Sequence, residues 1–228
     1  MLINDPHYEE GMYVYTAIFG GINDKLRYRA RQKKEISFLA FTDNDKGGLG
    51  RKKKRWLMQP PVFYLENARR KARAHKILAH QLFKNAQYTL WVDGCLKVIE
   101  NDMEALVEKH LSDADICVFK HKRRKCVYEE VNACIQQNKD EPQVMLTQVE
   151  RYRREGYPEN NGLAETTAVL RRHNSTTALF NELWWKELVE GSLRDQLSFD
   201  YVAWKLGIKY NVFPGTCMHS PYFKWYRH

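Results

Sequence analysis

The apolar positions along the chain repeat with two different periods. Short runs rich in β-branched and aromatic residues predict strands, and they occur at 12–21, 35–44, 88–93, 113–121 and 164–174. Longer amphipathic stretches predict helices at 65–85, 101–112, 142–156, 176–192 and 194–207. The segment 44–55, rich in glycine and charge, predicts a loop. Because strands alternate with helices, the pattern predicts an α/β fold with a mixed sheet flanked by helices.

Two of the predicted strands end at a carboxylate. Asp43 lies at the end of 35–44, and Asp93 follows the apolar run "YTLWV" and precedes Gly94. Ligands of open α/β sheets bind beyond the carboxyl ends of the strands, and a glycine there lets a ligand approach the backbone. A strand-end carboxylate is a common ligand for Mg²⁺ or Mn²⁺ that bridges a diphosphate. An aspartate that merely opens a turn is the structural alternative.

The predicted helix 65–85 carries a cationic face. Its basic residues recur at spacings of four, three and four, which places Arg69, Arg73, Lys76 and His80 on one side of the helix. Arginine binds phosphate oxygens through two parallel hydrogen bonds, whereas lysine acts as a point charge. The spacing therefore fits a grip on a diphosphate, and it fits a solvated helix face equally well.

The charge balance favours an anionic partner. The chain has 228 residues and a net charge of +9, much of it in "RKKKR" (51–55) and "HKRRK" (121–125). A nucleotide, a nucleic acid or an acidic glycan would suit this balance, and two solvated loops are the alternative. Five cysteines without a CxxC pair indicate neither a disulfide framework nor a zinc site.

The sequence gives no sign of a membrane partner. No apolar run approaches the roughly 18 residues of a membrane-spanning helix, and the first residues lack the pattern of a secretory signal. We therefore expect a soluble, cytoplasmic protein.

Nine stretches, in the same order along the chain, resemble a glycosyltransferase-like family that was long labelled a domain of unknown function and has plant Golgi members. They are "YTAIFGGINDKL" (15–26), "NARRKARAHKILAHQLF" (67–83), "WVDG" (91–94), "HKRRKCVYEE" (121–130), "QVERYRREGYP" (148–158), "GLAE" (162–165), "RRHN" (171–174), "LWW" (183–185) and "RDQLSF" (194–199). The resemblance implies a single GT-A-like, Rossmann-related domain over 1–228. It also implies an enzyme that transfers a hexosyl or pentosyl group from a nucleotide-sugar, with a UDP-sugar expected, to a hydroxyl acceptor.

The resemblance also assigns roles to residues near the donor. The nucleotide would be held by Ile18, Phe19, Gly20, Gly21 and Asp43, and the diphosphate by Arg69, Arg73 and Lys76. Asp93 is similar to the first acid of the metal-binding DxD motif, but the sequence Asp93-Gly94-Cys95 lacks the second acid. This departure leaves a requirement for Mn²⁺ or Mg²⁺ open. The tail 208–228 resembles a segment that closes over the donor in some retaining enzymes, with His219 as a metal ligand and Lys224 as a phosphate contact.

The acceptor side of the reaction is less determined. Asp195 or Glu165 would orient or deprotonate the acceptor hydroxyl, and the sequence does not choose between them; a helix N-cap is the alternative for Asp195. The basic runs favour a polyanionic acceptor, with a modified base in DNA as the leading candidate and a glycan as an alternative. A non-catalytic nucleic-acid-binding module is a further hypothesis, but such a module would avoid the strand-end acids Asp43 and Asp93.

Overall fold

Strand β1 (Met12–Ile18) lies inside the main sheet because both of its faces are apolar. Tyr13 and Tyr15 pack into the core on one side of the sheet, and Val14 packs into a second core on the other side. This alternation is the period of two that a strand imposes. The computed structural model describes residues 11–20, 26–27, 29–43 and 52–227.

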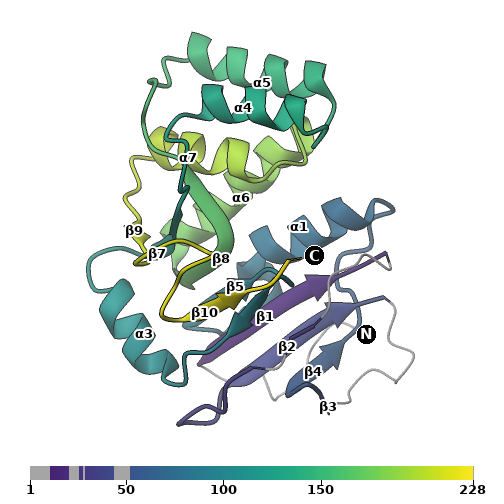
Figure 1. Cartoon of the computed structure of the whole chain (residues 1–228), viewed down its shortest axis with the longest axis vertical. Coiled ribbons are helices and arrows are strands. Elements are labelled where there is room, and N and C mark those ends of the chain that lie inside the picture. Colours follow the sequence, from purple (N-terminus) through teal and green to yellow (C-terminus); the bar gives the residue numbers. More distant parts are fainter. Residues whose placement is uncertain (1–10, 21–25, 28, 44–51, 228) are drawn as a thin grey trace.

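Within this described part, the main sheet has eight strands in the order β3-β4-β2-β1-β5-β8-β7-β9 (Figure 1). Their bounds are β2 (Ser37–Thr42), β3 (Lys52–Lys53), β4 (Trp56–Gln59), β5 (Tyr88–Val92), β7 (Ile116–Lys120), β8 (Ala164–Arg172) and β9 (Asn211–Val212). β1 is parallel to β2 and β5, whereas β8 is antiparallel to β5 and β7. The sheet is therefore mixed, as the sequence predicts.

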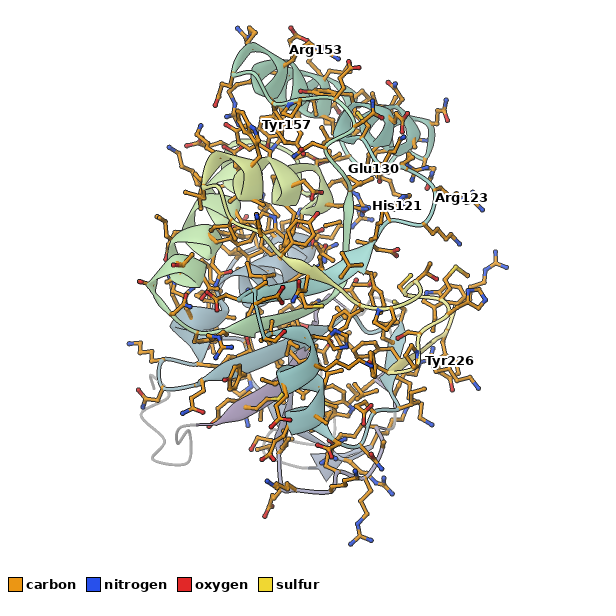
Figure 2. The ribbon with its side chains drawn as sticks, turned by 90° about the vertical axis from the view of Figure 1, so that its left-hand side faces the viewer. His121, Arg123, Glu130, Arg153, Tyr157 and Tyr226 are labelled. Atoms are coloured by element: carbon orange, nitrogen blue, oxygen red, sulfur yellow. The ribbon has the colours of Figure 1, made fainter. Side chains whose placement is uncertain are left out.

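Helices cover both faces of the sheet. One face carries α1 (Ala68–Ile77), α6 (Ser175–Glu190) and α7 (Gln196–Lys205), and the other carries α3 (Met103–His110) (Figure 1). α4 (Val127–Gln136) and α5 (Pro142–Arg154) form an outer layer on α6 and α7. Tyr157 lies where α5 meets α7 and stacks edge-on against Tyr152 and Tyr201 (Figure 2).

The strands and helices differ from the predicted ones in four places. The predicted helix 65–85 is interrupted at Leu78, which separates α1 from the short helix α2 (Ala79–Leu82). Helix α4 was not predicted, and residues 52–55 of the predicted loop 44–55 form strand β3 and the turn that leads into β4. The tail contributes β9 to the main sheet, and β10 (Phe223–Trp225) pairs with β6 (Leu96–Val98).

The pairing register brings distant segments to one edge of the sheet. Ile18 pairs with Thr42, so the parallel strands β1 and β2 end side by side. β5 ends at the same edge, and Val92 pairs with Ala168 of the antiparallel β8. The segment Ala164–Thr167 at the start of β8 therefore lies beside Asp93. The described part of the chain contains no helix that is both long and apolar enough to span a bilayer.

Candidate active site

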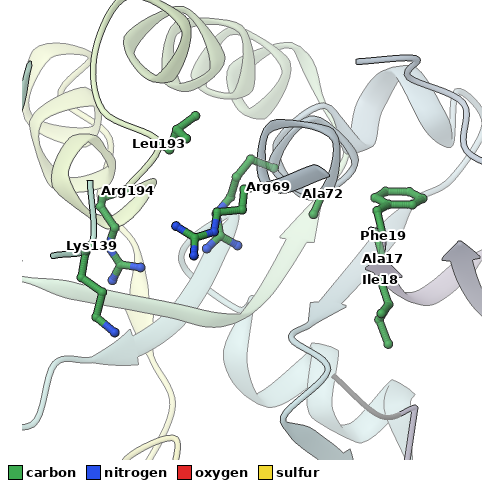
Figure 3. A pocket seen from close by; sticks show the side chains of 9 residues that line it. Ala17, Ile18, Phe19, Arg69, Ala72, Lys139, Leu193 and Arg194 are labelled. Atoms are coloured by element: carbon green, nitrogen blue, oxygen red, sulfur yellow. The ribbon is translucent and has the colours of Figure 1, made fainter. Parts of the chain in front are cut away.

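A cationic pocket of about 250 Å³ opens at the carboxyl end of β1 (Figure 3). Its wall combines the end of β1 and helix α1 with two loops from the second half of the chain, and its lining residues are Ala17, Ile18, Phe19, Arg69, Ala72, Arg73, Lys139, Leu193 and Arg194. Four of these side chains are cationic, and none of the described lining residues is acidic. Figure 3 shows the charged ends of Arg69, Lys139 and Arg194 turned toward the same space. Such a pocket suits a diphosphate.

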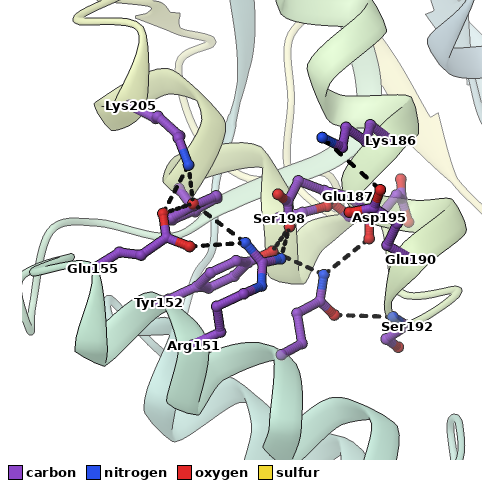
Figure 4. A network of polar contacts seen from close by, with 12 residues as sticks. Arg151, Tyr152, Glu155, Lys186, Glu187, Glu190, Ser192, Asp195, Ser198 and Lys205 are labelled. Carbon is purple, nitrogen blue, oxygen red and sulfur yellow. Dashed lines mark hydrogen bonds and ion pairs between the residues drawn. The ribbon is translucent and has the colours of Figure 1, made fainter.

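The loop that carries Arg194 is held by buried polar contacts (Figure 4). Gln148 of α5 accepts a hydrogen bond from the Ser192 backbone N–H at 2.9 Å and donates one to the Glu187 carbonyl at 3.1 Å. A Cβ on Gly191 would lie 2.4 Å from the Gln148 side chain, so a larger residue there would displace the Gln148 amide from these hydrogen bonds. Asp140 accepts the Ser192 hydroxyl at 2.6 Å. These contacts bring Arg194 and Lys139, which neighbours Asp140, to the pocket.

Asp195 is a buried anion beneath the pocket. It is 2% exposed, and its Oδ2 accepts hydrogen bonds from Lys76 Nζ at 2.5 Å and Thr166 Oγ1 at 2.8 Å. Its Oδ1 lies 3.0 Å from Arg73 Nε. Burial opposes ionisation, but the charges of Arg73 and Lys76 prevail and hold the pKa of Asp195 well below its usual range. The carboxylate also makes no side-chain N-cap bond to α7.

These contacts weaken the predicted role of Asp195 as a general base. A carboxylate whose pKa is depressed and whose lone pairs are already shared binds a proton poorly. What Asp195 does in the folded chain is fix the positions of Arg73 and Lys76.

Lys76 connects this anion to the strand-end acid. It is 1% exposed and does not line the pocket. Its Nζ lies 3.8 Å from Asp93 Oδ1, and burial lowers its pKa despite the two carboxylates. Asp93 also accepts a hydrogen bond from Trp91 Nε1 at 2.6 Å, and its side chain is 24% exposed. Alternating charges therefore run from Arg73 through Asp195 and Lys76 to Asp93.

Arg171 explains why helix α1 ends where it does. This fully buried side chain donates hydrogen bonds to the carbonyls of Lys76, at 2.5 Å, and Ile77, at 3.0 Å. The Tyr15 hydroxyl also donates to the Lys76 carbonyl at 3.0 Å. A cation at a helix C-terminus satisfies free carbonyls and complements the helix dipole. The prediction that His80 shares the face of Arg69 and Arg73 is therefore wrong, because beyond the break His80 bonds Glu182 of α6 at 2.8 Å.

The segment after β1 is tied to Asp43 and to the start of α1. The Gly20 backbone N–H donates to Asp43 Oδ1 at 3.0 Å, and Lys71 Nζ lies 3.3 Å from Asp43 Oδ2. Gly20 has φ of +73°, and a Cβ there would lie 2.7 Å from the Ala68 Cβ. Ile18 and Phe19 line the pocket, so three of the predicted nucleotide contacts lie together with Asp43. Gly21 lies outside the described residues.

Glu165 lies on the opposite face of β8 from Thr166 and Asp195. Its Oε1 accepts a hydrogen bond from the Cys217 thiol at 2.7 Å. Burial, followed by Glu165 itself, raises the pKa of Cys217 to about 12, so the thiol keeps its proton. The five cysteines of the chain are all free and buried. The two candidate bases therefore occupy separate environments, and Glu165 is the less buried of them.

The tail passes beside the turn that contains Asp93. The Tyr226 backbone N–H donates to the Cys95 carbonyl at 2.9 Å. His219 closes an exposed turn with Thr216, and Lys224 is exposed on β10. No contact joins either side chain to Asp93 in the described part of the chain. Closure of the tail over the donor, with His219 and Lys224 in the predicted roles, stays a prediction.

The residues around Asp93 do not fit a complete divalent-metal site. Among the described residues, no group of three or more His, Cys, Asp or Glu side chains could hold a metal ion. One oxygen of Asp93 already accepts the Trp91 N–H, and the Lys76 ammonium lies 3.8 Å from it. The four cations that line the pocket are groups that suit the charge of a diphosphate.

Side chains of the second basic run (121–125) make contacts within the protein. Arg124 hydrogen-bonds the Glu130 carboxylate and lies 3.2 Å from the His121 ring. Lys122 Nζ contacts the Met218 sulfur at 2.8 Å. Figure 2 shows Arg123 extending away from the body of the protein. In the first run, Arg51 lies outside the described residues.

Comparison with known proteins gives a family and two relatives. The family model TOD1/MUCI70, glycosyltransferase-like domain, matches residues 7–228. The Arabidopsis thaliana protein named "Probable hexosyltransferase MUCI70" is 28% identical over 224 residues, which cover 88% of this chain and 38% of that protein. "Alkaline ceramidase TOD1" of A. thaliana is 27% identical over 151 residues, which cover 60% of this chain and 32% of that protein. The chain thus spans less than two fifths of either relative.

A solved structure shares the fold. The apo crystal structure of mouse xyloside xylosyltransferase 1 matches with a TM-score of 0.51 and 12% sequence identity, over 89% of this chain and 85% of that chain. That protein is a GT-A-type glycosyltransferase, so the expected GT-A fold is confirmed.

Proposed function

Because the chain belongs to the TOD1/MUCI70 glycosyltransferase-like family, we propose that it transfers a sugar from a nucleotide-sugar held at the cationic pocket to an acceptor hydroxyl. The membership confirms the resemblance of the sequence motifs, and a UDP-sugar is the donor we expect. The observation that carries the proposal is the pocket itself, where Arg69, Arg73, Arg194 and Lys139 converge at the carboxyl edge of the sheet.

The pocket supplies the electrostatic part of the reaction. When the glycosidic bond to the donor breaks, the leaving nucleoside diphosphate gains negative charge. Preorganised cations lower the energy of that transition state because they need no rearrangement as the charge develops. Asp195 keeps Arg73 in place for this role through the 3.0 Å ion pair. We propose that Asp93, which is partly exposed at the end of β5, contacts the sugar or the diphosphate.

Of the two candidates for the acceptor base, we propose Glu165 rather than Asp195. The Glu165 carboxylate accepts the neutral thiol of Cys217 and has no ion pair with a described cation. Two cations, by contrast, hold the pKa of Asp195 well below its usual range and share its oxygens. Glu165 directly precedes Thr166 on β8. An acceptor bound at Glu165 would therefore lie near the edge of the sheet that carries the donor pocket.

A glycan or a small hydroxyl compound is the acceptor we propose in place of DNA. The DNA hypothesis depends on the two basic runs, and the 121–125 run commits Arg124 and Lys122 to internal contacts. A non-catalytic nucleic-acid-binding role is disfavoured by the acids beside the pocket, Asp43 and Asp93. Cytoplasmic localisation and a single domain over 1–228 stay predictions.

A donor screen tests the proposed function. Binding and hydrolysis of UDP-, GDP- and ADP-sugars would be measured with and without Mn²⁺, for the wild type, Arg69→Gln and Arg70→Gln. Arg70 neighbours Arg69 on α1 but does not line the pocket, so it is the matched control. We expect binding of one donor class to weaken about tenfold or more in Arg69→Gln only. Absence of binding to any nucleotide-sugar, or equal loss in both variants, would contradict the proposal.

A further inference from the structure

A second basic pocket, of about 560 Å³, lies at the other end of the parallel strands. It is built around the start of β2, whereas the candidate donor pocket lies at the end of β1. The two openings therefore face opposite edges of the sheet, separated by roughly 20 Å for a strand of this length. The cations of the second pocket are Arg29, Arg31, Lys33, Lys34 and Arg55.

Two of its arginines hold each other in place. Arg29 Nε donates to the Arg55 carbonyl at 3.0 Å, and Arg55 Nη1 donates to the Arg29 carbonyl at 3.2 Å. The Arg29 guanidinium also lies 4.0 Å from the centroid of the Phe38 ring, which fixes its plane. Burial and the neighbouring charge of Arg55 lower the pKa of Arg29. Two like charges are thus held close together by the backbone.

The turn that presents Arg55 is unusual for its sequence. Lys54 and Arg55 connect β3 to β4 with φ of 51° and 69°, the left-handed values that two-residue hairpin turns require. Asn-Gly or Asp-Gly is the common sequence for such a turn, because other residues are strained there. Strained backbone of this kind is concentrated at functional sites. Here the strain accompanies the placement of a cation beside Arg29.

The charges of this pocket are only partly balanced. Lys33 pairs with Asp102 at 3.0 Å, and Lys34 pairs with Glu104. No described carboxylate lies within ion-pair distance of Arg29, Arg31 or Arg55. Glu35 is the one acid among the described lining residues, and it is exposed. No described carboxylate therefore neutralises these three guanidinium groups. Arg29 also donates to the Ala30 carbonyl at 3.1 Å, so an anionic ligand would bind the N–H groups of Arg29 and Arg55 that do not donate to carbonyls, together with Arg31.

We propose that this pocket is a second binding site, which takes an acidic glycan whose carboxylate or sulfate groups bind to Arg29, Arg31 and Arg55. Guanidinium forks match the geometry of such groups. Proteins that bind single-stranded nucleic acid also need exposed aromatic rings on which bases stack. The one aromatic side chain that lines the described pocket, Phe38, is 2% exposed and lies under Arg29. Binding at this site needs no nucleotide-sugar, so the inference stands independently of the proposed transfer reaction.

A binding titration with the full chain tests this site. The probes are a short uronic-acid oligomer, a short sulfated oligosaccharide, a neutral oligosaccharide and a DNA duplex, each at low and high salt. The test variant combines Arg31→Gln with Arg55→Gln. The control variant combines Arg154→Gln with Lys186→Gln, which removes the same charge from exposed positions on α5 and α6.

We expect an acidic oligosaccharide to bind the wild type in a salt-sensitive manner and the neutral one not to bind. The affinity should fall about tenfold or more in the test variant and less than twofold in the control. UDP binding and the melting temperature should be unchanged in both variants. Arg29→Lys, which keeps the charge but loses the fork, should give an intermediate loss. Equal affinity in all variants would overturn the proposal, and so would DNA binding as tight as that of the acidic oligosaccharides with the same loss in the test variant.

Discussion

The two faces of strand β8 hold carboxylates in opposite states. On one face, Asp195 is buried and shared among Lys76, Arg73 and Thr166. On the other face, Glu165 is less buried and accepts one hydrogen bond from the neutral thiol of Cys217. The first arrangement can hold cations in position but cannot readily take up a proton. The second leaves the carboxylate without an ion pair to any described cation. Asp195 therefore holds cations in position, whereas Glu165 is the carboxylate that we propose as the acceptor base.

The largest effect should come from removing the Asp195 carboxylate, which should lower the free energy of unfolding. Asp195→Ala leaves Lys76 buried without its closest counter-ion, and breaking a buried pair in this way costs about 3–5 kcal/mol. We expect a corresponding decrease in the free energy of unfolding, measured by urea denaturation. The exposed pair of Lys186 and Glu190 is the control, because Glu190→Ala should cost less than about 1 kcal/mol. If the two variants lost the same stability, Asp195 would not be the anchor of this network.

The strand-end acid should affect turnover without affecting the fold. In Asp93→Asn the amide oxygen can still accept the Trp91 N–H and Lys76 keeps Asp195 as its closer partner, so the fold should be retained with only a small decrease in the melting temperature. Loss of the carboxylate charge should lower the transfer rate by about 10²–10³, the usual cost of one electrostatic contact in the transition state. The measurement is the single-turnover rate at saturating donor. Near-normal turnover with an unchanged melting temperature would remove Asp93 from the reaction.

Glu165→Gln tests the proposed acceptor base. The amide oxygen can still accept the Cys217 thiol, so we expect a normal fold and a normal dissociation constant for the donor. Transfer to the acceptor should fall by about 10², because a general base typically contributes that factor or more. Donor hydrolysis by water serves as the internal reference. An unchanged transfer rate would show that Glu165 is not the base.

The smallest effect should be the pH dependence of the free energy of unfolding that results from the buried side chain of His75. Burial lowers the pKa of His75 to about 4, and the ring accepts the Val62 N–H through Nε2 at 3.0 Å. The unfolded chain therefore binds this proton at higher pH than the folded protein does, so stability decreases as the pH falls below the unfolded pKa. Between pH 6.5 and 5.5 the contribution of His75 should fall by roughly 1 kcal/mol. His219→Gln, at an exposed position, should leave this slope unchanged, whereas a flat wild-type profile would contradict the burial of a neutral His75.

Local patterns were enough to predict part of this site. Arg69 and Arg73 are four residues apart on one helix, and Asp93 follows an apolar run, so each signal lies within a short window of sequence. The same patterns predicted the α/β fold and the main strands. Their assembly around one pocket follows from parallel strands that end at a common edge.

Other parts of the site depend on contacts that no short window contains. Arg194 and Lys139 reach the pocket through loops held by Gln148 and Asp140. The break at Leu78 has no glycine or proline to signal it, since the helix end is determined by Arg171 of β8. Helix α4 had a readable signal, because Val127, Val131 and Cys134 follow helical spacing, but no helix was predicted there.

The most direct test of the central claim is a crystal structure of the protein with a bound nucleoside diphosphate. We predict that the diphosphate oxygens lie within hydrogen-bond distance of Arg69, Arg73 and Arg194, with Asp195 still paired to Lys76 and Arg73. The base should lie toward Ile18, Phe19 and Asp43. A diphosphate bound away from helix α1, at either edge of the sheet, would contradict the assignment of the cationic pocket as the donor site.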